Sequence, residues 1–173
     1  MLKLCKVTDA ANIDLKSFSD EIYLKLNAGK LQPILDTLVT IKNEGVWLEI
    51  ANLVVPSWTD DLDMIKRMCN WLAENGFAET PLHFSRFQPM HKLTQLPPTP
   101  VNTLKNARDI AVWEGLKYVY VGNVPGLGSE STTCPKCSKV VVKRKGYSII
   151  QNNLENGKCK FCNSPVAGVW GNA

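Results

Sequence analysis

Two cysteine pairs near the end of the chain have the spacing of a metal site. Two residues separate the cysteines within each pair, and 21 residues separate the pairs, which are formed by Cys134, Cys137, Cys159 and Cys162. A two-residue spacer lets one tight turn direct both sulfurs toward a single point, and thiolates favour Zn²⁺, with iron as the competitor. Because four protein ligands leave no open position for a substrate, the pattern predicts a structural zinc site. The alternative is two disulfides, which the cytosolic character of the remaining sequence disfavours.

The bulk composition is that of a globular protein. The chain has 173 residues, of which 45% are hydrophobic and 21% charged, enough for one medium domain and a small appendage. It contains no run of 18 apolar residues, and no long apolar segment follows Met1. We therefore expect a cytoplasmic protein with no membrane partner. The two remaining cysteines, Cys5 and Cys69, are far apart in the sequence.

Positive charge is concentrated after residue 130. Residues 131–173 carry seven Lys/Arg against Glu155 alone, a balance of +6, whereas residues 1–130 carry 13 against 15, a balance of −2. Such a basic segment could bind nucleic acid. It could equally be a solvated face that offsets the negative charge of the thiolates, and we favour this second interpretation.

Strand-like and helix-like segments alternate before the cysteine pairs. Strands are predicted over 12–16, 46–55, 82–87 and 117–121. Helices are predicted over 19–27, from 31 to Gly45, from a cap at Thr59 or Asp60 through 72, and from the Thr99 cap to Gly115. Two short β segments, 140–143 and 147–151, lie between the cysteine pairs. We therefore predict an α/β protein: a partial (β/α) barrel of about four units over 1–129, followed by a small β zinc ribbon over 130–173.

Several predicted strands carry polar residues that a buried strand would not need. Asp14 lies on the polar side of the first strand, whereas both faces of a parallel strand are normally apolar. Glu49 and Asn52 are the only polar residues of the second strand. The helical stripe that includes Met68 and Cys69 is expected to be core. The turn at 122–126 follows the last strand, where α/β folds place ligand contacts.

These segments resemble a known family. The stretches 11–16 (Ala-Asn-Ile-Asp-Leu-Lys), 46–49 (Val-Trp-Leu-Glu) and 54–56 (Val-Val-Pro) resemble the radical SAM enzymes related to pyruvate formate-lyase activase. Further stretches make the resemblance more specific: 83–87 (His-Phe-Ser-Arg-Phe), 97–100 (Pro-Pro-Thr-Pro), 118–125 (Tyr-Val-Tyr-Val-Gly-Asn-Val-Pro) and the cysteine pairs. Together they resemble the C-terminal half of the radical SAM enzyme of the AmmeMemoRadiSam system, in the same order over nearly the whole chain.

The resemblance implies cofactors and residues that would hold them. The family has a partial (β/α) barrel that binds a [4Fe–4S] cluster and S-adenosylmethionine (SAM), and reductive cleavage of SAM gives a 5′-deoxyadenosyl radical. Asp14 and Lys16 match the Asp-Leu-Lys motif that contacts SAM in the activases. Relatives tend to have His at the position of Gln88, and Gln still donates a hydrogen bond but does not titrate. Asn123 is a further candidate because it follows a strand end.

The sequence also departs from the family. It contains no Cys-x3-Cys-x2-Cys cluster loop, so we expect the chain to be inactive alone, with an N-terminal half of the barrel or a second copy as its partner. We expect Asp14, Lys16, Glu49 and Gln88 to lie toward one concave face at the carboxyl ends of the strands, with Asn123 close by. Two alternatives remain: a zinc-ribbon module that binds nucleic acid or protein, and a small α/β domain with its own ligand site.

Overall fold

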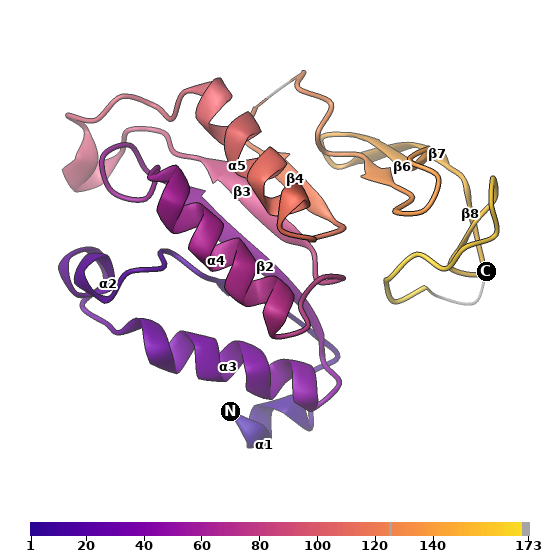
Figure 1. Cartoon of the computed structure of the whole chain (residues 1–173), viewed down its shortest axis with the longest axis horizontal. Helices are drawn as coiled ribbons and strands as arrows, with labels where there is room; N and C mark the ends of the chain where they lie inside the picture. Colours follow the sequence, from indigo (N-terminus) through magenta and orange to yellow (C-terminus); the bar gives the residue numbers. More distant parts are fainter. Residues whose placement is uncertain (125, 171–173) are drawn as a thin grey trace. The chain divides into compact units, whose positions relative to one another are not determined.

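The computed structural model describes residues 1–124 and 126–170, which form two compact units, Met1–Asn123 and Val124–Ala173 (Figure 1). The sequence placed the boundary between its two predicted parts at residues 129 and 130. The first unit alternates helices and strands: α1 (Leu2–Cys5), β1 (Ala10–Asp14), α2 (Asp20–Asn27), α3 (Leu31–Asn43), β2 (Trp47–Val54), α4 (Leu62–Glu74), β3 (Leu82–Arg86), the 3-10 helix η1 (His91–Leu93), α5 (Val101–Trp113) and β4 (Val119–Gly122).

The four strands of the first unit form one parallel sheet in chain order, β1-β2-β3-β4. A helix lies within each connection, as parallel strands require. Figure 1 shows α3, α4 and α5 arranged over one face of this sheet. The predicted α/β fold, a partial barrel of about four units, is confirmed in this unit.

The helix-covered face of the sheet holds the core. Alternate residues of β2 are buried, namely Leu48, Ile50, Asn52 and Val54, because successive side chains of a strand point to opposite faces. The buried stripe of α4 faces them and includes Met68 and Cys69, which confirms that these two residues are core. Burial raises the pKa of the Cys69 thiol to about 12, so this thiol stays protonated.

The opposite face of the sheet is only half-buried and is partly polar. The other residues of β2, among them Glu49, alternate with the buried ones. The parallel register places Asn12 beside Glu49 and Asp14 beside Ala51, on the same face. It also places His83 beside Ala51 and beside Tyr120 of β4. A parallel sheet is usually covered on both faces, so this polar face is a departure that the sequence pattern of the strands had indicated.

Two predicted helix caps are wrong, and both threonines bond elsewhere. Asp61 caps α4 in place of Thr59 or Asp60, because its Oδ1 accepts from the backbone N–H of Asp63 at 2.9 Å. The Thr59 hydroxyl instead accepts from the N–H of Val55 and donates to the carbonyl of Leu53. At α5 the N-cap is Pro100, without a side-chain cap bond.

The second unit is built from short antiparallel strands: β5 (Thr132–Thr133), β6 (Val140–Lys145), β7 (Ser148–Asn152), β8 (Leu154–Glu155) and β9 (Lys158–Cys159). β5, β6 and β7 form one sheet in that order, and β8 pairs with β9. Its buried aliphatic side chains among the described residues are Val124, Val141, Val142, Leu154 and Val166. The predicted hairpin between the cysteine pairs is therefore confirmed, with Gly146 at its tip in the left-handed region (φ 58°).

The sequence patterns did not predict α1, β5, β8 or β9. Each has two to four residues, which is too short to show a helical or strand period. In the described part of the chain, no helix has both the length and the apolar character needed to cross a membrane.

The Thr99 hydroxyl generates the first prediction. Its Oγ1 accepts from the N–H of Phe87 at 2.9 Å and donates to the carbonyl of Val54 at 2.6 Å, and Thr99 is fully buried. Thr99→Val keeps the shape but leaves both backbone groups unsatisfied, so we expect unfolding free energy to fall by about 2–4 kcal/mol in urea denaturation. The exposed Thr94→Val is the matched control and should stay within about 0.5 kcal/mol of the wild type. Equal effects of the two changes would contradict this role.

Candidate functional site

The four cysteines of the two pairs converge in the second unit. The Sγ atoms of Cys134, Cys137, Cys159 and Cys162 all lie within 4.8 Å of one another. The Sγ atoms are 3.6 Å apart between Cys134 and Cys162, and 3.7 Å apart between Cys137 and Cys159. None of the four forms a disulfide, so the structure gives the two-disulfide alternative no support. The chain therefore has a four-cysteine site that can hold a metal ion.

Two matching turns direct the sulfurs inward. In the first, the N–H of Ser138 donates to the carbonyl of Cys134 at 2.9 Å, and in the second the N–H of Asn163 donates to Cys159 at 2.8 Å. Ser138 and Asn163 both adopt the left-handed region, each at φ 57°. Asn tolerates this conformation well, and Ser adopts it here although Gly is the usual residue.

Ser164 contacts two of the four sulfurs, and sequence reasoning did not identify it. Its Oγ lies 3.2 Å from the Sγ of Cys134 and 3.0 Å from that of Cys162. Burial raises the pKa of Cys134, but hydrogen bonds, first from Ser164 and then from backbone N–H groups, lower it to about 6. The Ser164 hydroxyl is also the main cause that lowers the pKa of Cys162. At Cys137 a backbone hydrogen bond from Lys139 lowers the pKa, but burial and the neighbouring thiols together outweigh it and raise the pKa to about 11.

In the first unit, Asp14 and Lys16 lie at the end of β1 and pair with each other. The Lys16 Nζ is 2.9 Å from the Asp14 carboxylate, and both side chains are exposed. The backbone between and around them is fixed by buried partners. The Nδ2 of Asn52 donates to the carbonyl of Leu15 at 2.6 Å, and the N–H of Lys16 donates to the Tyr23 hydroxyl at 2.9 Å. The core therefore holds this loop while its two charged side chains face outward.

Glu49 forms a second polar group on the same sheet face. Its Oε2 lies 3.1 Å from the Nε2 of His83, across the two neighbouring strands β2 and β3. The His83 ring stacks on Tyr120 with ring centroids 4.9 Å apart. This row lies toward the middle of the strands, whereas Asp14 lies at the carboxyl end of β1. Sequence reasoning missed His83 and Tyr120, which the alternation of β3 and β4 places on the half-buried face.

A cleft lies at the carboxyl ends of β2, β3 and β4. Its volume is about 1240 Å³, and it is lined by residues of α2, β2, the end of β3, the loop that follows β3 and the residue after β4. The polar side chains of its lining are three cations, one histidine and two amides: Lys25, Arg86, Lys92, His91, Gln88 and Asn123. The other lining residues are apolar, and no acidic residue is among those described. The cleft therefore suits a ligand with an anionic group and an apolar or aromatic body.

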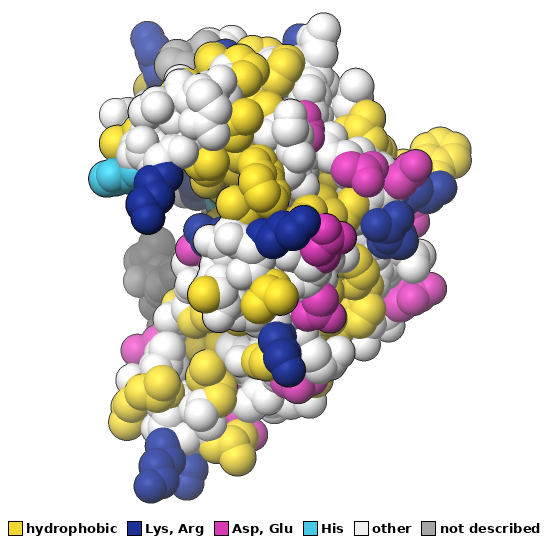
Figure 2. All heavy atoms as spheres, turned by 90° about the vertical axis from the view of Figure 1, so that its left-hand side faces the viewer, with side chains coloured by type: hydrophobic (Ala, Val, Ile, Leu, Met, Phe, Trp, Pro, Cys, Tyr) yellow, Lys and Arg dark blue, Asp and Glu magenta, His cyan; other side chains and the backbone are white. Residues whose placement is uncertain are grey.

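Hydrogen bonds to backbone carbonyls position two of the polar side chains of this cleft. The Nε of Arg86 donates to the carbonyl of Thr99 at 2.8 Å, and the Nδ2 of Asn123 lies 3.5 Å from the carbonyl of Arg86. Asn123 and His91 adopt the left-handed region, at φ 61° and 51°. Figure 2 shows the side of the first unit seen from the left of Figure 1, where hydrophobic side chains gather beside basic ones.

The residues named from the sequence fall into three groups. Asp14 pairs with Lys16, Glu49 with His83, and Gln88 shares the cleft with Asn123. Asp14, Lys16 and Glu49 are not part of the cleft lining that the structure describes. The sequence did not single out the cleft residues Lys25, Arg86 and Lys92, because isolated cations are common on any protein surface.

Comparison with known proteins identifies relatives of this chain. No protein-family model matches it. The chain is 43% identical over 160 residues to the uncharacterized protein MJ0808 of Methanocaldococcus jannaschii. This alignment covers 91% of the chain and 48% of that protein. It is 32% identical over 77 residues to the pyruvate formate-lyase 1-activating enzyme of Escherichia coli K12, and this alignment covers 44% of the chain and 31% of the enzyme. The chain thus spans less than half the length of either relative.

A solved structure shares the fold. The crystal structure of a domain of pyruvate-formate lyase-activating enzyme from Bacteroides vulgatus matches with a TM-score of 0.57 and 15% sequence identity. The match covers 70% of this chain and 71% of that domain. The chain is therefore similar in sequence to a pyruvate formate-lyase activating enzyme and has the fold of a domain of one.

Proposed function

We propose that the first unit is the SAM-binding wall of a radical SAM enzyme of the AmmeMemoRadiSam type, related to pyruvate formate-lyase activase. The observation that carries this proposal is the basic cleft at the carboxyl ends of a parallel sheet, in a chain that is similar to an activase. Ligands of open α/β sheets bind at that end of the strands. The chain would be the C-terminal part of such an enzyme.

The chemistry of SAM suits the residues at this edge of the sheet. SAM carries a carboxylate, an ammonium group, a sulfonium cation, ribose hydroxyls and an adenine ring, and its carboxylate, hydroxyls and adenine are the groups that suit these cations and amides. The cations Lys25 and Arg86 would attract the carboxylate, and the amides of Gln88 and Asn123 would bond the ribose or adenine. Asp14 and Lys16, which match the family's SAM-contacting motif, would extend the wall along the open sheet face.

The residues of this chain do not fit the family's iron–sulfur cluster. The sequence has no Cys-x3-Cys-x2-Cys loop, and four of its six cysteines converge on the metal site of the second unit. We propose that the chain alone does not cleave SAM and that another segment or chain supplies the cluster. A few hydrogen bonds of about 0.5–1.5 kcal/mol each, without iron chelation, would give millimolar binding at best, since that affinity already needs about 4 kcal/mol.

The partner would pair with the edge of the sheet. β1 is an edge strand, and its burial alternates between exposed and half-buried residues along its whole length. An unpaired strand edge presents N–H and C=O groups that favour association. We propose that an N-terminal half of the barrel, or a second copy of the chain, adds strands to β1.

We propose that the four-cysteine site binds one structural Zn²⁺. Four sulfurs at about 2.3 Å from a central ion stand about 3.8 Å apart in a tetrahedron, close to the two separations of 3.6 and 3.7 Å in this site. Sulfurs this close surround one ion rather than a multi-iron cluster. With all four positions taken by protein, the ion stabilises the second unit and takes no part in catalysis.

The cleft generates a prediction on SAM binding. Titration of the full chain with SAM, followed by backbone NMR, should shift the amides of Gln88 and Asn123, with a dissociation constant of about 1 mM or weaker. Gln88→Ala should weaken binding about three- to tenfold, because it removes one hydrogen bond worth about 0.5–1.5 kcal/mol. Gln151→Ala, an exposed residue of β7, is the matched control and should leave binding unchanged.

The same purified chain tests the proposal that it does not cleave SAM by itself. After anaerobic incubation with iron, sulfide, SAM and dithionite, we expect no 5′-deoxyadenosine above background. SAM-dependent shifts that avoid the cleft would contradict the binding wall. Cluster-dependent release of 5′-deoxyadenosine would instead contradict the statement that the chain lacks a cluster site, while leaving the binding wall intact.

The metal proposal predicts the effect of losing one ligand. The purified chain should contain one zinc per chain by elemental analysis, and Cys159→Ser should lose it and unfold residues 130–170, because metal-binding energy is folding energy in such units. The amide spectrum of the first unit should persist. Cys5→Ser, outside the site, should keep the zinc. A wild-type chain without stoichiometric metal would overturn the proposal.

Ser164 should tune the affinity of that site. Its hydroxyl bonds two of the sulfurs, and loss of such an outer partner typically lowers metal affinity about 10- to 100-fold. We expect this loss for Ser164→Ala in competition with a chromogenic chelator at pH 7. Ser148→Ala, on exposed β7, is the control and should match the wild type. Equal affinity of all three proteins would show that Ser164 only packs beside the sulfurs.

A further inference from the structure

The second unit carries positive charge that its own acidic residues do not balance. Residues 124–173 hold seven Lys/Arg and two glutamates, Glu130 and Glu155, a balance of +5. Four thiolates on one Zn²⁺ would leave +3. Glu130 is held at the hairpin tip, where its Oε2 accepts from the backbone N–H of Gly146 at 2.6 Å.

Three of these cations are consecutive and lead to the tip of the β6–β7 hairpin (Val140–Asn152), which we call the basic hairpin. Lys143, Arg144 and Lys145 are all exposed. None of the ion pairs found among the described residues includes any of them. The hairpin therefore presents an unneutralised cationic strip to the solvent.

Exposed apolar side chains lie beside this strip. Tyr147, at the tip, is fully exposed, Ile149 is 61% exposed and Ile150 is 57% exposed. A face that served only to be solvated would not combine cations with three exposed apolar side chains in four positions. This combination favours a binding surface, whereas the charge pattern of the sequence alone favours a solvated face.

The edge strand β7 is poorly suited to pairing with a peptide strand. The register between β6 and β7 shifts after Lys143, so the edge is irregular. Irregular edges and lysines are devices that prevent strand addition. The exposed side chains, rather than the backbone edge, are therefore the surface that a partner would contact.

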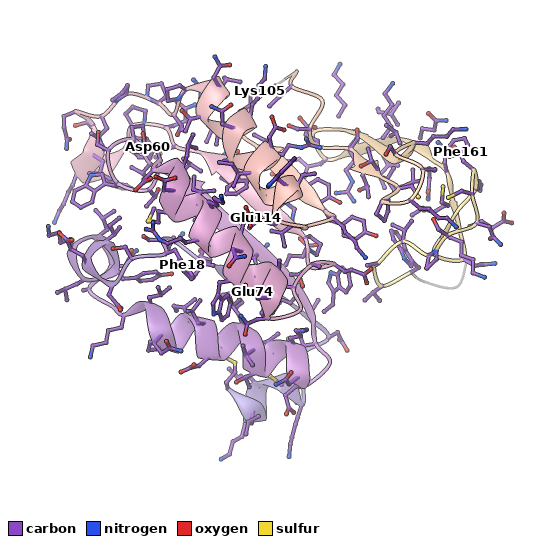
Figure 3. The ribbon with its side chains drawn as sticks, viewed as in Figure 1. Phe18, Asp60, Glu74, Lys105, Glu114 and Phe161 are labelled. Atoms are coloured by element: carbon purple, nitrogen blue, oxygen red, sulfur yellow. The ribbon has the colours of Figure 1, made fainter. Side chains whose placement is uncertain are left out.

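A second aromatic residue of the unit already has a cation over its ring. Phe161, labelled in Figure 3, is 47% exposed, and the Lys139 Nζ lies 4.7 Å from its ring centroid. Alternating cations and exposed aromatic rings are the features that bind single-stranded nucleic acid, because the cations follow the phosphates and unpaired bases stack on the rings.

We propose that the basic hairpin binds single-stranded nucleic acid, with Lys143, Arg144 and Lys145 on the phosphates and Tyr147 stacking on a base. Duplex bases are already stacked on each other, so the ring at the tip favours an unpaired strand. Phosphate contacts carry no sequence information, so binding is largely independent of sequence. This proposal does not rest on SAM binding by the first unit.

The test uses fluorescence anisotropy of the full, zinc-loaded chain with labelled oligo-U and oligo-dT of about 20 nucleotides. Between about 50 and 200 mM salt, three phosphate contacts predict a slope of log K against log salt of about −2. Replacing Lys143, Arg144 and Lys145 by Ala should remove that slope and weaken binding at least tenfold. The matched control replaces Lys30, Arg67 and Lys105 of the first unit, all exposed, and should keep most of the affinity.

Two substitutions of Tyr147 distinguish base stacking from simple charge attraction between protein and nucleic acid. Tyr147→Ala should weaken binding roughly fivefold or more, whereas Tyr147→Phe should retain it, because the ring and not the hydroxyl stacks. Zinc content and circular dichroism of each variant establish that it is folded. Equal loss in the two triple variants, an unchanged Tyr147→Ala, tighter binding to duplex, or equally tight binding of poly-glutamate would each overturn the proposal.

Discussion

Backbone groups released at the ends of parallel strands must find partners, and this constraint shapes the candidate site of the first unit. Once a strand leaves the sheet, its N–H and C=O groups lose their ladder partners, and buried groups without partners are costly. Here the partners are side chains: Thr99 bonds Phe87 and Val54, Thr59 bonds Val55 and Leu53, and Asn52 bonds Leu15. These bonds fix where each loop leaves the sheet and therefore where its charged side chains can reach.

The apolar core on the helix-covered face explains why the unit can keep an open, partly polar sheet face. The helix-covered face supplies an apolar core that includes Phe84, Ile50 and Leu72, so the opposite face does not need to be apolar. Glu49 and His83 bond each other there at the cost of little desolvation, because both side chains remain about one-third exposed. A protein that completes the barrel would cover these groups, and their mutual pairing would then satisfy both.

The sequence predicted the elements of the fold better than the exact partners of polar side chains. Amphipathic periods and glycine stops located α2, α3, α4 and α5, since burial of one face acts along the whole helix. Thr99 looked like a helix cap because a Thr-Pro pair is a frequent cap signal, but the hydroxyl satisfied two buried strand ends instead. Tertiary bonds of this kind join residues 12 and 45 positions apart, and no local pattern shows them.

The residues of the candidate sites could likewise be predicted only where a local sequence pattern marks them. Four cysteines with fixed spacing predict their own convergence, whereas Ser164 lies near two sulfurs only because the second turn brings it there. Gln88 and Asn123 were named from a resemblance and a strand end, and the structure places both at one cleft. The cleft's cations come from α2, β3 and the loop after β3, so their approach depends on the order of the strands, which the sequence alone leaves open.

A bound metal ion, as we propose for the small second unit, would stabilise it for a physical reason. A unit of this size buries few aliphatic side chains, and its excess of positive charge opposes compaction. Four thiolates around one divalent ion would supply both binding energy and negative charge at the centre of the unit. If the proposed metal, rather than a large core, holds the fold, the hairpin could extend exposed cations and an aromatic ring into solvent without losing its own framework. On these two proposals, the stability of the unit and the exposure of the hairpin would both follow from the four cysteine ligands.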